Sequence, residues 1–372
     1  MRSGEMSSQD SIAWAKPALA GREKEYVEDA LLSSWISGGR YVERFEREFA
    51  SLYGVPYVLT VTSGTAALYL ALRALGIGPG DEVIVPGFTF AAPVNMVIET
   101  GATPVYADVD SSTWCLDTPS VRESITSRTK AILAVHLYGN VCEMEALQEM
   151  ARQSGLFIIE DVAQAAFSRY KGRYAGTWGD ISCFSFHATK TIAMGEGGCV
   201  LTSREAYYTQ MHILRDHGMS RDKRYWHDVR GYNFRLTNLQ AAVGCAQLER
   251  IKDIISRRRQ IYGWYYRHLN DVRGITLQAF NPETEPVVWT LAVKLDPAFF
   301  KGERDFVMNA LSCVGIETRP GFYPFSAMPL YQAPRLPVAE EVAGRIICLP
   351  FYPDLLEEQV ALICGEVKKL SA

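Results

Sequence analysis

The chain has 372 residues, with 38 Lys and Arg against 42 Asp and Glu, a formal net charge of -4, and 48% hydrophobic residues. These values are typical of a globular protein and exclude a disordered or collagen-like chain. The weak negative charge offers no basic field for a nucleic acid, and no stretch reaches the roughly 20 apolar residues of a membrane helix. We therefore expect neither partner. The short basic run Arg257 to Arg259 is predicted to be a solvated helix face.

The cysteines and the N-terminus indicate the compartment. Eight cysteines are scattered through apolar surroundings, and no two form a Cys-x-x-Cys pair. This usage argues against a disulfide framework or a zinc site, and no metal is expected. The first ten residues are polar and lack the apolar core of a secretion signal. We predict a cytoplasmic protein.

Between residues 57 and 203, seven short apolar runs alternate with helical patterns such as 65–75 and 144–153. Most runs have four or five residues and little polar alternation, a pattern typical of strands buried on both faces of a mostly parallel sheet. We therefore predict an α/β domain. The runs lie at residues 57–61, 82–85, 103–106, 131–135, 156–159, 183–186 and 199–201.

The pattern changes after Leu236, where residues 237–268 form one long helical stretch that predicts one or two helices. A further apolar run at 287–293, a helix over 304–314, a loop over 319–337 and a terminal helix after Leu355 complete the chain. These elements predict a smaller C-terminal α/β domain. We place the boundary between residues 1–250 and residues 251–372.

Residues 62–67 read Thr-Ser-Gly-Thr-Ala-Ala at a predicted turn from strand to helix. Ligands of open α/β sheets bind beyond the carboxyl ends of the strands. Small and hydroxyl residues at a helix N-terminus leave backbone N–H groups free for a phosphate. A simple helix N-cap is the alternative.

Two ionisable residues follow later strands. Asp161 follows the apolar run 156–159, and a carboxylate at the end of a buried strand is costly unless it meets a cation such as a protonated ring nitrogen; a helix N-cap is the alternative. Lys190 precedes a run of glycines in a loop between two apolar strands. If buried, it has a lowered pKa and can form a Schiff base; an exposed loop lysine is the alternative. A phosphate site, a carboxylate and a lysine together predict pyridoxal 5'-phosphate (PLP).

Five segments with these residues, in this order and spacing, carry a family resemblance. They read TSGTAAL at 62–68, VPGFTF at 85–90, GATPV at 101–105, IEDVAQA at 159–165 and FSFHATK at 184–190. They are similar to the DegT/DnrJ/EryC1/StrS family of PLP-dependent sugar aminotransferases, and the similarity runs from about Trp35 to the C-terminus. The resemblance implies the aspartate aminotransferase fold (PLP fold type I), with a large mostly parallel α/β domain and a smaller C-terminal one.

The resemblance also implies the roles of the site residues. Lys190 would be the Schiff-base lysine and proton carrier, and Asp161 would hold the pyridine nitrogen. Gln164 would lie near the ring hydroxyl and Phe90 would stack on the ring. The residues expected around the phosphate are Gly64, Thr65, Ala66 and Ser185.

A further segment, GYNFRL at 231–236, matches a family motif whose asparagine reaches the phosphate of the neighbouring subunit's cofactor. If Asn233 does so, neither subunit has a complete site alone. The resemblance therefore implies a homodimer with active sites at the subunit interface.

Residues 224–227 (RYWH), 315–320 (GIETRP) and 322–324 (FYP) resemble the perosamine-forming subgroup, which aminates carbon 4 of a GDP-linked 4-keto-6-deoxymannose with L-glutamate. The substrate-binding residues implied are His187, His227, Arg319 and Tyr323. The alternatives are amination of a 3-keto or other keto sugar, a PLP-dependent sugar dehydratase, and a binding homologue without catalysis. The related dehydratases carry histidine in place of Lys190, which argues against the second of these. Arg319 in a surface ion pair and His187 as an ordinary strand-end histidine are the alternatives for those residues.

Overall fold

The computed structural model describes residues 11–220 and 222–371. The first ten residues, on which the absence of a secretion signal was predicted, lie outside the described part. Within that part, no helix has the length and apolar character needed to cross a membrane.

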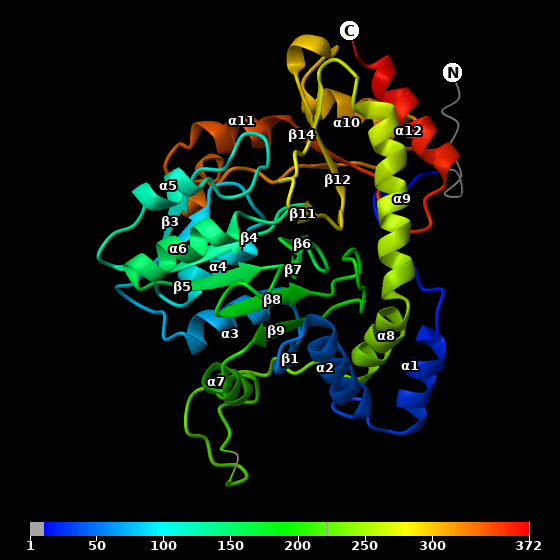
Figure 1. Ribbon diagram of the computed structural model, residues 1–372. Helices are drawn as coiled ribbons and strands as arrows, with labels where there is room; N and C mark the ends of the chain where they lie inside the picture. Colours follow the sequence, from blue (N-terminus) through cyan, green and yellow to red (C-terminus); the bar gives the residue numbers. More distant parts are fainter. Residues whose placement is uncertain (1–10, 221, 372) are drawn as a thin grey trace.

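The largest element is a seven-stranded sheet in the order β1-β9-β8-β5-β4-β2-β3 (Figure 1). β9 runs antiparallel to both of its neighbours and the other pairs are parallel, so the predicted mostly parallel sheet is confirmed. All seven predicted strands form, with ends that differ by at most two residues. Their bounds are β1 (Tyr57–Val61), β2 (Glu82–Pro86), β3 (Thr103–Ala107), β4 (Thr129–Val135), β5 (Phe157–Asp161), β8 (Ile181–Ser185) and β9 (Gly198–Thr202).

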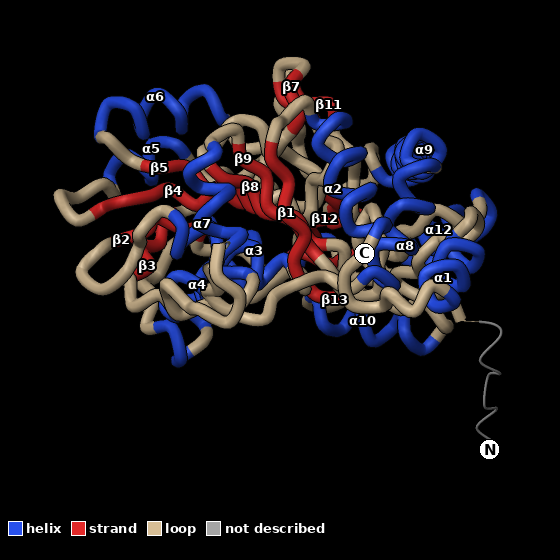
Figure 2. The backbone as a smooth tube through the Cα atoms, turned by 90° about the horizontal axis from the view of Figure 1, so that it is seen from below, coloured by secondary structure: helices blue, strands red, loops and turns tan. Residues whose placement is uncertain are grey.

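Helices cover both faces of this sheet (Figure 2). α3 (Gly64–Ala74), α4 (Ala92–Glu99) and α7 (Glu205–Arg215) lie on one face, and α5 (Thr118–Glu123) and α6 (Met144–Ser154) on the other. α1 (Glu23–Leu32) and α2 (Arg40–Tyr53) pack against α8 (Asn238–Glu249). α2 buries one aromatic side chain per turn, because an interval of four residues returns to the same helix face; these are Tyr41, Phe45, Phe49 and Tyr53.

The predicted helical stretch over 237–268 is two helices, α8 and α9 (Ile251–Leu269), which meet at Arg250. Thr237 and Gln240 form a capping box that starts α8. α9 runs upward in Figure 1 from the level of the large sheet and packs against α12 (Glu357–Lys369). It therefore links the two halves of the molecule.

The C-terminal part has a four-stranded antiparallel sheet in the order β10-β12-β14-β13. Its strands are β10 (Ile275–Leu277), β12 (Leu291–Leu295), β14 (Ile346–Leu349) and β13 (Arg319–Pro320), accompanied by α10 (Arg304–Cys313), α11 (Pro337–Arg345) and α12. A second buried apolar cluster includes Tyr265, Val293, Leu311 and Ile363. The smaller C-terminal α/β unit is confirmed, and the boundary at residue 250 stays a prediction.

Three short strands connect the two halves, in the order β11-β6-β7. They are β6 (Arg169–Tyr170), β7 (Arg173–Tyr174) and β11 (Thr284–Glu285). The predicted loop over 319–337 contains two 3-10 helices, η2 (Phe325–Ala327) and η3 (Pro329–Tyr331). A third 3-10 helix, η1, spans Pro297–Phe299. Of the apolar run 287–293, only the last three residues belong to a strand. Val287 instead packs on Gly139, where an added Cβ would lie 2.6 Å from the Val287 carbonyl oxygen.

Candidate active site

The predicted site residues gather at one edge of the large sheet, because the carboxyl ends of its parallel strands lie there together. Gly64 follows β1, Phe90 follows β2, Asp161 ends β5 and Ser185 ends β8, with Lys190 five residues further along. Side chains from four strands thus meet at one edge, although more than 120 residues separate the first from the last.

The segment after β1 is both a helix cap and a close contact with β8. Ser63 Oγ accepts the Ala66 N–H at 3.1 Å, so the N-cap is present and the Ala66 N–H is already used. A Cβ at Gly64 would lie 2.9 Å from Ser185 Cβ, so a side chain there would displace Ser185. The N–H groups of Gly64 and Thr65 open the helix and have no acceptor within it. They can bind an anion beside the Ser185 hydroxyl.

Asp161 is 6% exposed at the end of β5. One of its carboxylate oxygens accepts the Ala163 N–H at 3.0 Å. The residues that follow form a turn, so the helix N-cap alternative is wrong. Burial raises the pKa of Asp161, while the Ala163 N–H and the charge on Lys190 oppose that rise. The carboxylate is therefore costly without a cationic partner.

Lys190 is half-buried, and its Nζ lies 3.6 Å from the centre of the Trp289 ring. Burial lowers the pKa of Lys190 to about 8, and the charge on Asp161 opposes the decrease. The alternative of an exposed loop lysine is wrong. At pH 7 about a tenth of an amine with this pKa is unprotonated, far more than for an ordinary lysine, and a nucleophile or base requires the unprotonated form.

A fully buried pair, His136 and Glu160, lies next to Asp161: the His136 N–H donates to the Asp161 carbonyl oxygen at 3.1 Å, and Glu160 precedes Asp161 in β5. His136 Nε2 and Glu160 Oε2 are 3.0 Å apart, and both side chains are fully buried. His136 Nδ1 accepts the Cys142 N–H at 3.3 Å, so Nε2 carries the proton and donates it to Glu160. Burial alone would raise the pKa of Glu160, but hydrogen bonds from His136 and from backbone N–H groups hold it below its usual range. The sequence reasoning missed His136, although it directly follows a predicted strand.

We expect Glu160→Gln to lower the free energy of unfolding by about 2 to 4 kcal/mol, because the amide presents an N–H group to backbone donors that now meet a carboxylate. Those donors are the N–H groups of Gly176, Trp178 and Gly179, at 2.6 to 2.7 Å. Denaturant unfolding of E160Q and of the exposed control E149Q measures the effect. Because the folded pKa is lowered, this stabilisation is present above the unfolded pKa of about 4.3 and is lost as pH falls below it. An E160Q as stable as E149Q would contradict the prediction.

Phe90 belongs to a group of aromatic rings that also includes Phe322 and Tyr138. Phe90 is 58% exposed and lies 6.0 Å from Phe322, which stacks on Tyr138 at 5.6 Å. Gln164 is buried, and its Oε1 accepts the Tyr138 N–H at 3.2 Å. Phe90 therefore presents an open ring face, and Gln164 is fixed beside the same aromatic group.

The four predicted substrate residues are all exposed, and each has a partner of its own. His187 Nδ1 lies 3.0 Å from Thr189 Oγ1, beside Lys190 in sequence. Arg319 pairs with Glu317, as its surface ion-pair alternative expects, and lies 5.5 Å from the Trp14 ring. Tyr323 is contacted by Arg304, and His227 Nδ1 lies 2.9 Å from the His217 carbonyl oxygen. Asn233 is also exposed, on the segment that follows α7.

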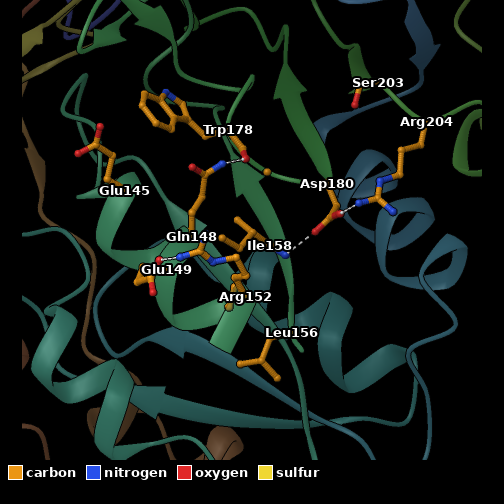
Figure 3. Close-up of a pocket in the computed structure, with 12 residues that line it drawn as sticks. Glu145, Gln148, Glu149, Arg152, Leu156, Ile158, Trp178, Asp180, Ser203 and Arg204 are labelled. Carbon is orange, nitrogen blue, oxygen red and sulfur yellow. Dashed lines mark hydrogen bonds and ion pairs between the residues drawn. The ribbon is translucent and has the colours of Figure 1, made fainter. Parts of the chain in front are cut away.

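Two hollows lie at opposite edges of the large sheet. The first lies at the N-terminus of α3, has a volume of about 720 Å³ and is lined by Ser63, Thr65, Tyr69, Asn95, Tyr232 and Tyr331. The second, shown in Figure 3, lies at the opposite edge of the sheet. Several of its charged groups are already paired: Asp180 accepts the Ile158 N–H at 2.9 Å and contacts Arg204 at 3.3 Å. The first hollow adjoins the predicted site residues, and the second does not.

The residues at the carboxyl edge fit the predicted cofactor. A buried carboxylate with a raised pKa favours a cationic partner, which a pyridinium nitrogen supplies. Gly64 lies against Ser185, so the N–H groups of Gly64 and Thr65 are close to the Ser185 hydroxyl. Together these three groups can bind a phosphate. A half-buried lysine with a lowered pKa suits an aldehyde.

Comparisons with known proteins agree with this site. GDP-perosamine synthase of Escherichia coli O157:H7 is 44% identical to the chain over 357 residues, which cover 95% of this chain and 97% of that protein. A UDP-N-acetyl-3-dehydro-alpha-D-glucosamine 3-aminotransferase of Acidithiobacillus ferrooxidans is 40% identical, covering 89% of each. The structure of a putative sugar aminotransferase from Streptococcus pneumoniae in its PLP form matches with a TM-score of 0.92 and 28% identity, covering 97% of this chain and 98% of that one.

Residues 17–368 match the family described as the DegT/DnrJ/EryC1/StrS aminotransferase family. The match begins earlier than the predicted resemblance, which began at about Trp35. The chain therefore belongs to this family of PLP-dependent sugar aminotransferases, with the fold type I architecture of its relatives.

Proposed function

We propose that the chain transfers the amino group of L-glutamate to the 4-keto carbon of a nucleotide-linked 4-keto-6-deoxyhexose. The observation that carries the catalytic part of the proposal is the pair formed by Lys190, with its pKa lowered to about 8, and the buried carboxylate of Asp161. The support for the substrate is the 44% identity to a GDP-perosamine synthase over nearly the whole chain.

The two charged residues divide the work. PLP, when bound, supplies an aldehyde that condenses with amines and a ring that accepts electrons from the adjacent carbon. Asp161 holds the proton on the ring nitrogen. Because its carboxylate is buried, an ion pair with the protonated nitrogen is more stable than an unpaired carboxylate. Lys190 would hold the aldehyde carbon of the cofactor through its Nζ, and as a free amine it would take the proton from the α-carbon of glutamate. The same amine returns a proton when the keto sugar is aminated.

The remaining cofactor residues bind and orient. Gly64, Thr65 and Ser185 hold the phosphate through two backbone N–H groups and a hydroxyl, with Ala66 next to them in the first turn of α3. Phe90 covers the ring with its exposed face, and Gln164 lies near the ring hydroxyl. His187, His227, Arg319 and Tyr323 are proposed to contact the sugar nucleotide, which suits their exposure.

A panel of keto sugar nucleotides with L-glutamate as donor tests the substrate. We expect 2-oxoglutarate to form with a GDP-linked 4-keto-6-deoxy sugar and not with 3-keto sugars. Amination of a 3-keto sugar is the second candidate, supported by the 40% identity to a 3-aminotransferase. Activity confined to 3-keto substrates would replace the first proposal by the second.

We further propose a homodimer in which Asn233 of one subunit completes the phosphate site of the other. Three observations support this. Asn233 is exposed, the hollow beside α3 is open, and two large apolar side chains that line it are uncovered, since Ile98 is 42% and Leu330 79% exposed. Uncovered apolar groups around a site are typical of an interface.

Mixed dimers of Lys190→Ala and Asn233→Ala subunits test the shared site. If Asn233 acts in the neighbouring site, each mixed dimer has one site with both residues intact, and a random mixture recovers roughly a quarter of wild-type activity at limiting PLP. Separate K190A and N233A dimers serve as controls, the second with PLP affinity weakened roughly tenfold by the lost hydrogen bond. If Asn233 served its own subunit, mixing would restore nothing.

We also propose a cytoplasmic location. It is supported by the cysteines, which are all free and, apart from Cys313, buried.

A further inference from the structure

Trp289 lies against the side chain of Lys190, although no motif drew attention to it. The Lys190 Nζ is 3.6 Å from the centre of the Trp289 ring, and Trp289 is 7% exposed. An ammonium within about 6 Å of an aromatic face is stabilised by the electron density of the ring, and tryptophan stabilises it most. The contact therefore favours the protonated form of Lys190, whereas burial favours the neutral form.

The indole also fixes the turn that carries the lysine. Its Nε1 donates a hydrogen bond to the Thr189 carbonyl oxygen at 2.7 Å. Thr189 directly precedes Lys190, so a single side chain contacts both the backbone of the turn and the amine at the end of the lysine side chain. The indole ring and the lysine side chain are thus held in a fixed position relative to each other.

A buried arginine holds the backbone of Trp289. One guanidinium nitrogen of Arg258 donates to the Trp289 carbonyl oxygen at 2.9 Å and to that of Val288 at 3.3 Å. Arg258 is 3% exposed, so the prediction of a solvated basic run over 257–259 is wrong for this residue. Burial lowers the pKa of Arg258 to about 10, which leaves it charged at neutral pH.

Neighbouring elements fix the segment from the other side. The Val287 N–H donates to Ser168 Oγ at 2.9 Å, and the Trp289 N–H donates to the Tyr138 carbonyl oxygen at 3.3 Å. The Trp289 ring is parallel to that of Tyr138 at 6.5 Å and meets Trp14 edge-on at 5.9 Å. A ring enclosed in this way has little freedom to turn away from Lys190.

We infer that Trp289 is a positioning residue for Lys190: its indole face holds the protonated amine whenever that amine is free, and its N–H fixes the turn. The inference rests on the proposed function, in which Lys190 alternates between neutral base and ammonium. Asp161 is the ionisable group whose charge acts on Lys190 from the end of β5, and the indole acts from the segment before β12. The two together oppose the effect of burial.

The pKa of Lys190 in the full-length, cofactor-free chain tests the inference. The rate of acetylation by acetic anhydride is measured against pH by mass spectrometry of the peptide that contains Lys190. We expect Trp289→Leu to lower this pKa by about half to one unit, because the ammonium loses the ring. Trp289→Phe keeps a weaker ring without the N–H and gives a smaller shift.

Trp264→Leu is the matched control, since Trp264 is a buried tryptophan of the second apolar cluster. This substitution is expected to leave the pKa of Lys190 unchanged. In the loaded enzyme, W289L lowers kcat roughly 3- to 30-fold with little change in KM for glutamate. A wild-type pKa in both W289F and W289L would overturn the inference. If PLP is not attached at Lys190, the proposed function fails instead, and the acetylation result still stands.

Discussion

Replacing Lys190 by alanine is expected to abolish transamination, with a loss of at least about 10⁴-fold in kcat, because both the Schiff base and the proton carrier disappear. Lys190→Arg is expected to be as inactive, since a guanidinium keeps the charge beside Asp161 but neither condenses with an aldehyde nor gives up a proton near neutral pH. Release of 2-oxoglutarate from glutamate measures both variants.

Two further measurements connect this loss to the lysine itself. Borohydride treatment of the wild-type protein with PLP is expected to remove the visible absorption band and to add the mass of the reduced cofactor to the peptide containing Lys190. Lys171→Ala is the control, because Lys171 forms surface ion pairs with Glu145 and Glu283. Retained transamination in K190A, or cofactor mass on another lysine, would refute the assignment.

The large sheet could be predicted because its strands are buried on both faces. Runs such as 82–85 and 131–135 contain almost no polar residue. This pattern distinguishes a parallel sheet covered on both faces from a sheet whose strands alternate polar and apolar residues. The order of the strands could not be read in the same way. β9 lies between β1 and β8 and runs against both, an arrangement that depends on packing between segments distant in sequence.

The proposed catalytic residues were within reach of the sequence because each follows a strand. Asp161 and Lys190 come after the predicted strands 156–159 and 183–186, and the rule that ligands bind at the carboxyl ends selects both, whereas Ser185 was implied by the family resemblance. The same rule also selects His136, which follows β4, and it was passed over because its partner Glu160 lies on another strand. The buried hydrogen bond between His136 and Glu160 becomes visible only when both strands are placed.

Trp289 and Arg258 show two different limits of sequence reasoning. Trp289 reaches a carbonyl 100 residues away in the chain, so no local pattern contains the contact. Arg258 did carry a signal: Ile254, Arg258, Ile261 and Tyr265 follow the spacing of one helix face, and all four are buried. Its charge suggested that the side chain is exposed to solvent. The carbonyl oxygens that compensate its burial come from a different segment.

Replacing Asp161 by asparagine is the second change with a large expected effect. The amide has nearly the same shape and can still accept the Ala163 N–H, but it carries no charge to keep a ring nitrogen protonated. We expect kcat to fall about 10²- to 10⁴-fold while PLP still binds through the phosphate residues. Glutamate turnover and the absorption spectrum of the loaded variant measure the two effects separately.

The same substitution also acts on Lys190, and the sign can be worked out. The Asp161 carboxylate stabilises the ammonium, so its loss is expected to lower the pKa of Lys190 further below about 8. Asp180→Asn is the matched control, because Asp180 lies at the opposite edge of the same sheet and also accepts a backbone N–H. If D161N had wild-type kcat, or if its lysine pKa rose, the carboxylate would have no part in the chemistry. A lowered pKa of Lys190 with an unchanged kcat would show that Asp161 acts on the lysine but has no role at the ring nitrogen of the cofactor.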